Sequence, residues 1–98
     1  MIRKKPVRNS SKVSVTFEAS GHDGAQSIAV VGDFNAWDPT KHTMKRRKDG
    51  QWSATIRLAK NDRYAFRYLV DGETWETDTE SDATEANRFG SMNSIVET

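Results

Sequence analysis

Polar and apolar residues alternate along three segments of the chain, 13–20, 52–58 and 63–70. Successive side chains of a β-strand point to opposite faces, so an alternation of this kind predicts a strand with one buried face. A short apolar run at residues 26–31 predicts a further strand. Shorter strands are expected at two more places: 43–48, where the charges favour an edge position, and 94–96.

The phase of each strand predicts which side chains face the core. Trp52 is in phase with the aliphatic residues that follow it, so its indole is expected inside. Within 63–70 the aromatic residues share one face, which leaves Arg67 on the other. Aspartate–glycine pairs at 49–50 and 71–72 predict tight turns. Because no segment has the 3.6-residue period of a helix, we predict an all-β chain that folds as a single antiparallel β-sandwich.

Composition limits the chain to one small domain. Of its 98 residues, 35% are hydrophobic and 30% are charged, which allows only a modest core. Residues 1–11 are basic and lack periodicity, so a flexible tail is expected before a folded domain at 12–98. The sequence has no cysteine, and His22 and His42 have no carboxylate at ligand spacing, so neither a metal nor another cofactor is expected.

The N-terminal basic residues are not followed by an apolar run, and no segment is long enough to span a bilayer. A cytoplasmic protein without membrane contact is therefore predicted. The net charge is +1, but residues 1–12 and 41–48 are basic whereas 71–86 carry acids and no base. Such blocks usually form solvated faces that complement each other, and the acidic block would oppose nucleic acid, so no nucleic-acid partner is expected.

Two tryptophans stand in polar surroundings. Residues 32–39 read GDFNAWDP, which places Trp37 among turn-forming residues directly after a predicted strand. Trp75 follows the turn at 71–72 and is flanked by glutamates and threonines. Side chains of this kind either pack on the edge of the sandwich or bind a ligand with a flat apolar face. The residues alone leave both interpretations open.

These motifs resemble carbohydrate-binding module family 48, the isoamylase N-terminal or early set domain, and within it the glycogen-binding domains of AMP-activated protein kinase beta subunits. The likeness covers residues 13–97 and rests on three motifs in order: GDFNAW at 32–37, VDG at 70–72 before Trp75, and FGSMN at 89–93. It implies an immunoglobulin-like sandwich that binds α-1,4-linked glucans such as glycogen, starch and maltooligosaccharides without cleaving them.

The resemblance also implies the residues of a carbohydrate-binding site: Trp37, Arg67, Trp75, Phe89, Ser91 and Asn93. Indole faces can stack on the C–H groups of glucose, and the polar side chains can bond its hydroxyls. Because the free-energy cost of association offsets most of the stacking energy, we expect a short glucan to bind weakly, with a dissociation constant on the order of 10 μM to 1 mM. The chain departs from the kinase domains by one additional residue before Trp75, which affects the height of that indole against the sugar.

Other classes of function stay open at this point. Glycoside hydrolysis needs two carboxylates in a shared, partly desolvated cleft, whereas the acids here lie in one loop, so no enzyme is expected. Family members often precede a glycoside hydrolase barrel, for which 98 residues have no room, so a stand-alone relative of such a domain in a hydrolase or branching enzyme is one alternative. A protein-interaction module that recruits a partner enzyme or kinase is another.

Overall fold

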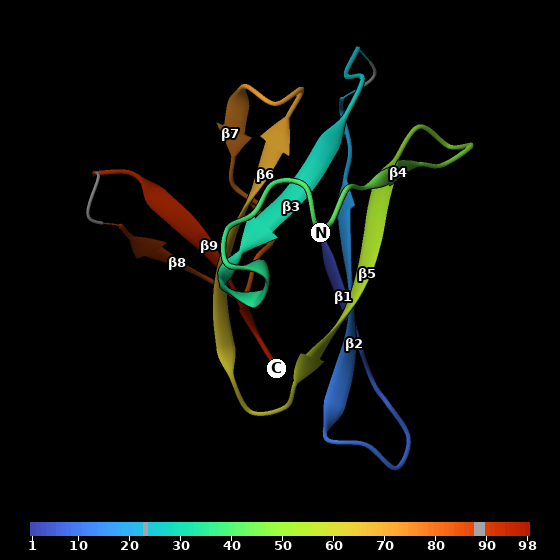
Figure 1. Cartoon of the computed structure of the whole chain (residues 1–98), viewed down its shortest axis with the longest axis vertical. Helices are drawn as coiled ribbons and strands as arrows, with labels where there is room; N and C mark the ends of the chain where they lie inside the picture. Colours follow the sequence, from blue (N-terminus) through green and yellow to red (C-terminus); the bar gives the residue numbers. More distant parts are fainter. Residues whose placement is uncertain (23, 88–89) are drawn as a thin grey trace.

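The structure, a computed structural model, describes residues 1–22, 24–87 and 90–98, which form two antiparallel β-sheets (Figure 1). The first sheet has the strand order β1 (Ile2–Pro6), β2 (Lys12–Ala19), β5 (Trp52–Ala59) and β4 (Lys45–Arg46). The second sheet has the order β3 (Ile28–Gly32), β6 (Arg63–Val70), β9 (Met92–Glu97) and β8 (Ala83–Ala86), and β7 (Thr74–Glu76) pairs with β6. The prediction of an all-β antiparallel sandwich is confirmed.

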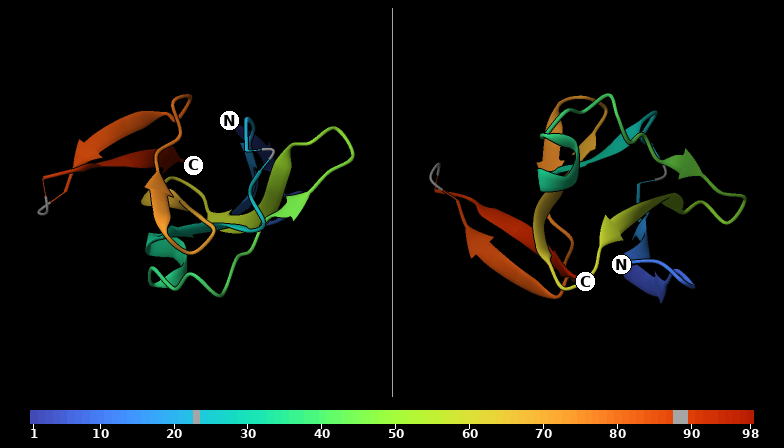
Figure 2. Two further views of the ribbon diagram at one scale, coloured as in Figure 1. Left: turned by 90° about the horizontal axis from the view of Figure 1, so that it is seen from above. Right: turned by 60° about the horizontal axis from the view of Figure 1, so that its bottom comes forward.

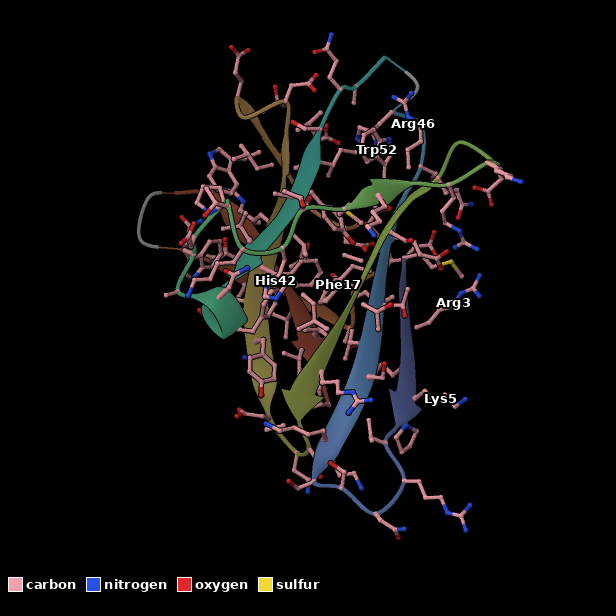
Figure 3. All side chains as sticks on the ribbon, turned by 45° about the vertical axis from the view of Figure 1, so that its right-hand side comes forward. Arg3, Lys5, Phe17, His42, Arg46 and Trp52 are labelled. Carbon is pink, nitrogen blue, oxygen red and sulfur yellow. The ribbon has the colours of Figure 1, made fainter. Side chains whose placement is uncertain are left out.

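The core lies between the inner faces of the two sheets. Phe17 of β2 and Phe66 of β6 are fully buried, and their ring centroids are 4.9 Å apart in an edge-to-face arrangement (Phe17 is labelled in Figure 3). Side chains from β2, β3, β5, β6 and β9 complete the same cluster. The alternation that predicted β2, β5 and β6 marks their core face, because burial of apolar surface favours one phase of each strand.

The turn between β4 and β5 forms as predicted. Gly50 adopts a positive φ of 84°, which glycine tolerates without steric cost, and the Arg47 N–H donates to the Gln51 carbonyl at 2.7 Å. Trp52 is buried, as its phase indicated, and the Arg46 guanidinium lies 4.8 Å from its ring centroid (Figure 3). This cation–π contact holds the edge strand β4 against the core.

Residues 1–11, expected to be a flexible tail, contain strand β1, and the structure corrects the expectation there. β1 pairs with β2 along its whole length, and Arg3 lies 2.8 Å from the buried carboxylate of Glu18. The free edge of β2 offers unpaired N–H and C=O groups, which can bind a further strand whatever the hydrophobic period of that strand. β1 is almost entirely exposed, so no alternation was available to reveal it.

The segment that follows the turn at 71–72, for which no strand was predicted, contains two strands. β7 pairs with β6, and β8 pairs with β9. Both are short and mostly exposed, so backbone hydrogen bonds hold them without any hydrophobic period. The β8–β9 hairpin projects from the rest of the second sheet (Figure 2).

Within the described part of the chain, helical structure is limited to the 3₁₀ turn η1 (Asp33–Asn35) that follows β3. Helix was predicted to be minor for lack of a 3.6-residue period, and this is confirmed. None of the described segments is a helix long and apolar enough to cross a bilayer.

Candidate functional site

The outer face of the second sheet, which is turned away from the core, carries a small apolar cluster. Ala29 and Val31 of β3 and Leu69 of β6 form it, and the half-buried indole of Trp37 packs against it. Arg67 pairs in register with Val31, so its side chain leaves β6 on this same face. The alternation of β6 therefore places Arg67 beside the cluster that Trp37 covers.

The loop after β3 divides two aromatic side chains between the two faces of the sheet. Phe34 turns inward, with its ring centroid 5.5 Å from that of Phe17, whereas Trp37 lies outside. Trp37 has a positive φ of 58° and directly follows Ala36 at 56°. Left-handed conformations cost roughly 1–2 kcal/mol for each residue with a Cβ, so neighbouring contacts must stabilise this turn.

Buried Asn35 stabilises the turn from its inner side. Its Oδ1 accepts the Gly32 N–H at 3.1 Å and its Nδ2 donates to the Val30 carbonyl at 3.0 Å. Because this orientation makes Nδ2 a donor, His42 accepts through Nδ1 at 2.9 Å and carries its proton on Nε2 when neutral. Gly32 packs so closely on β6 that a Cβ there would lie 2.8 Å from the Phe66 Cβ. The turn therefore requires glycine before η1.

Trp75 reaches the same outer face from β7. It pairs in register with Leu69 of β6, and cross-strand partners share a face of the sheet. The β6–β7 turn before Trp75 is held to the start of β3, because Asp71 Oδ1 accepts the backbone N–H groups of Ser27 at 3.0 Å and Gln26 at 2.7 Å. These two hydrogen bonds favour the charged carboxylate and lower the pKa of Asp71. Trp75 stays 44% exposed.

Between these elements lies an open cleft of about 630 Å³. Its lining comes from the η1 turn, β6, β7 and the β8–β9 hairpin: Asp33, Trp37, Ala65, Arg67, Trp75, Glu85, Asn87 and Asn93. Four of the six residues expected from the resemblance meet here, namely Trp37, Arg67, Trp75 and Asn93. Residues that are far apart in the sequence thus share one surface.

Of the other two expected residues, Ser91 is described and does not line the cleft. The Ser91 Oγ accepts the Asn87 Nδ2–H at 2.8 Å, and the same Nδ2 lies 3.3 Å from Asn93 Oδ1. Asn87 therefore ties Ser91 to Asn93 and leaves the Asn93 amide N–H groups as donors for the cleft. Phe89 lies outside the described residues.

Among the described residues, the polar part of the cleft combines one cation, Arg67, with two carboxylates, Asp33 and Glu85. The Arg67 Nε–H is buried without a hydrogen-bond partner among the described residues. The Arg67 side chain also lines the cleft, where the N–H groups of a guanidinium can donate to the hydroxyl oxygens of a ligand. Glu85 lies 3.5 Å from Arg63, and both side chains are half exposed. Asp33 is bonded through both oxygens, to Trp37 Nε1 at 3.0 Å and to a backbone N–H of β6 at 2.8 Å.

Sequence reasoning missed three polar residues of the cleft, Asp33, Glu85 and Asn87. Asp33 lies inside the first motif and Asn87 lies just before the last one. Their proximity to these motifs could have marked them as candidate site residues. Glu85 reaches the cleft because it pairs in register with Asn93. That register depends on strand β8, which no periodicity in the sequence reveals.

A second hollow, of about 360 Å³, includes three acidic side chains that have protein partners, Glu18, Glu76 and Asp78. Asp78 accepts the Met1 ammonium at 2.6 Å and the Tyr68 hydroxyl at 2.7 Å. Burial alone would raise the pKa of Asp78, but these hydrogen bonds outweigh it and lower the pKa. Burial and the bond to Asp78 raise the pKa of Tyr68. Within the described residues, Asp78, the Met1 ammonium and Tyr68 thus form a hydrogen-bonded ion network in this hollow.

The histidines have protein partners. His22 Nε2 lies 3.0 Å from a carboxylate oxygen of Glu76, and His42 is bonded to Asn35. No group of three or more histidine, cysteine or acidic side chains in the described residues could hold a metal ion.

A β-sandwich that gathers two tryptophans and several hydrogen-bonding side chains in one open cleft has the arrangement of a carbohydrate-binding module. Residues 13–98 match the family described as the glycogen recognition site of AMP-activated protein kinase, and the chain belongs to that family.

The chain is also similar to bacterial enzymes described as 1,4-alpha-glucan branching enzyme. It is 44% identical over 47 residues to GlgB 2 of Xanthomonas campestris pv. campestris (strain 8004), an alignment that covers 47% of this chain and 6% of that protein. It is 49% identical over 43 residues to GlgB of Nitrobacter hamburgensis, covering 43% of this chain and 6% of the relative. The matched stretch is therefore a small part of these relatives.

Proposed function

We propose that this chain binds α-1,4-linked glucans, without cleaving them, in the cleft that contains Trp37 and Trp75. The observation that carries this proposal is the convergence of both tryptophans with Arg67 and Asn93 on the outer face of the second sheet. The family to which the chain belongs is described as a glycogen recognition site, which supports a glucan as the ligand.

The cleft suits the two kinds of surface that a glucose unit presents. Its C–H faces can stack on Trp37 and Trp75, whose indoles both line the cleft. Its hydroxyl oxygens can accept from Arg67 and Asn93, and its hydroxyl protons can be donated to Glu85. Each of these groups thus meets a complementary part of the sugar.

The carboxylates of the cleft are not arranged for hydrolysis. Hydrolysis of a glycosidic bond needs one carboxylic acid as proton donor and a second carboxylate as nucleophile or base. Both oxygens of Asp33 are occupied by N–H donors, and Glu85 is half exposed beside Arg63. A bound glucan would therefore be held and left intact.

Affinity for one short chain would be weak, on the order of 10 μM to 1 mM, because association costs offset most of the stacking energy. Glycogen and starch present many chain ends, so effective concentration would hold the protein on the polymer more strongly. The similarity to branching enzymes supports a role in keeping an enzyme at its glucan, either within one chain or as a partner. We propose the cytoplasmic location that was predicted from the sequence.

Titration with maltoheptaose, followed by tryptophan fluorescence and calorimetry, tests the proposal. We expect quenching and saturable binding in the range given above, and no binding of cellohexaose, whose β-1,4 linkage gives a different chain shape. Glycogen in a native gel should retard the protein. Absence of a response to both maltoheptaose and glycogen would rule out the glucan site. Release of reducing sugar from glycogen by the pure protein would contradict binding without cleavage.

A further inference from the structure

The Asp33 carboxylate joins three parts of the cleft wall. It belongs to η1, its Oδ1 accepts the indole Nε1–H of Trp37 at 3.0 Å, and its Oδ2 accepts the backbone N–H of Ala65 in β6 at 2.8 Å. Through its two oxygens, the carboxylate therefore links the Trp37 indole to β6, the strand that also carries Arg67. The contact between Asp33 and Trp37 shares no residue with the ion network around Asp78.

Trp37 occupies a backbone conformation that an aromatic residue rarely adopts. Its φ is 58° and that of Ala36 is 56°, and the Trp37 N–H donates to the Gly32 carbonyl at 2.9 Å. The backbone bond fixes the Cα of Trp37, and the indole packs against Ala29, Val31 and Leu69. The bond from the indole Nε1–H to Asp33 restricts the rotation of the side chain further.

We propose that Asp33 is a positioning residue of the glucan site, which fixes the Trp37 indole as a preformed stacking surface. This inference rests on the proposed function. An indole that is already immobilised loses little freedom when sugar binds, so the entropic cost of binding is smaller. A carboxylate on the indole N–H also increases electron density on the ring face that meets the sugar C–H groups.

Asparagine cannot replace the carboxylate, although it has the same shape. The two partners of Asp33, Trp37 Nε1–H and the Ala65 N–H, are both donors. An asparagine side chain has one acceptor oxygen and one NH₂ group, so one of the two donors would face another donor. Asp33→Asn therefore tests the charge and the acceptors with little change in volume.

Asp38→Asn is a matched control in the same loop. Asp38 Oδ1 accepts from the Thr40 N–H at 2.9 Å and from the Thr40 hydroxyl at 2.7 Å, and it does not line the cleft. Both substitutions remove one negative charge from this loop, but only the change at Asp33 removes a partner of the indole.

The first measurement needs no ligand. The indole ¹H–¹⁵N signal of Trp37 is assigned in the full chain by its disappearance in Trp37→Phe. We expect Asp33→Asn to shift this signal and to increase the exchange of its proton with water, whereas Asp38→Asn leaves it unchanged. An unchanged Trp37 signal in Asp33→Asn would overturn the proposed contact, even if the wild-type protein binds glucan.

The second measurement is a double-mutant cycle on maltoheptaose affinity. Asp33→Asn should weaken binding about 3- to 10-fold in the wild-type background, the scale expected for one side chain that must be ordered on binding. Trp37→Phe keeps an aromatic ring but has no N–H, so Asp33→Asn should change its affinity less than about 2-fold.

Equal losses of affinity in both backgrounds would show that Asp33 does not act through the indole, and would refute the positioning role. The same spectra show whether each variant is folded, so loss of the fold is separated from loss of affinity. If the wild-type protein fails to bind maltoheptaose, the proposed function fails and the positioning role falls with it. An altered indole signal in Asp33→Asn would then still establish the contact between the two residues.

Discussion

Replacement of Trp75 by alanine separates ligand binding from stability better than any other change in the cleft. Trp75 lies on the short strand β7, it is 44% exposed, and it does not belong to the main core cluster. Its indole can thus be removed with little loss of burial, whereas Trp37 packs against its own apolar cluster. We expect Trp75→Ala to fold with a thermal midpoint near that of the wild type and to bind maltoheptaose more weakly.

The magnitude follows from the exposed area. If a whole tryptophan side chain presents roughly 250 Å², an exposure of 44% leaves about 110 Å² open to a ligand. Complete coverage by sugar at 25 cal/mol per Å² contributes about 2.7 kcal/mol, and coverage of half of it about 1.4 kcal/mol. The dissociation constant should therefore increase by about 10- to 100-fold.

Calorimetric titration with maltoheptaose measures this change, and Met92→Ala provides the control. Met92 is also 44% exposed and lies on β9, but it does not line the cleft, so its truncation should leave the affinity unchanged. A Trp75→Ala protein that is folded and binds within about 2-fold of the wild type would refute the stacking role. An equal loss of affinity in Met92→Ala would show that the effect is not specific to the cleft.

Three further predictions concern the polar contact, the loop and the acid limit of stability. Arg67→Met keeps the aliphatic stem but removes every donor, so maltoheptaose affinity measured by calorimetry should fall about 10-fold or more; unchanged affinity would remove Arg67 from the site. Gly32→Ala should lower the free energy of unfolding in urea by about 1–3 kcal/mol, because the new Cβ would meet Phe66 and the β6 backbone; a smaller loss would contradict the packing argument. The lowered pKa of Asp78 means that its stabilising effect is present above its ordinary value of 3.8 and is lost as the pH falls through the lower folded value. The thermal midpoint of Asp78→Asn should therefore decrease less than that of the wild type when the pH is lowered from 5 to 2. Parallel plots of thermal midpoint against pH for the two proteins would show that Asp78 does not set the acid limit of stability.

Strand phase was the most reliable part of the sequence analysis. Trp52 lies in the core and Arg67 shares the outer face with Val31, because one phase of each alternating strand is buried. The strands β1, β7 and β8 were not predicted, since they are held by backbone pairing and bury little apolar surface. Pairing of this kind leaves no trace in the pattern of side chains.

In the cleft, too, some features could be predicted from the sequence and others depend on strand pairing. The first motif indicated a tight turn with Trp37 outside a core, but it did not show that Asp33 holds the indole, because that contact depends on how the turn folds over β6. Glu85 became a cleft residue only through its register with Asn93. Side chains far apart along the chain meet only once strand order and register are known.

By itself, the sequence determined the sandwich, the core faces of its long strands and the two tryptophans kept outside the core, since each depends on local alternation and turn chemistry. Only the tertiary structure decided that Trp75 shares a face with Trp37. Its pairing with Leu69 places the indole on the face that lines the cleft. The physical reason is that a strand exposes alternate faces, so register with a neighbouring strand decides which surface a side chain joins.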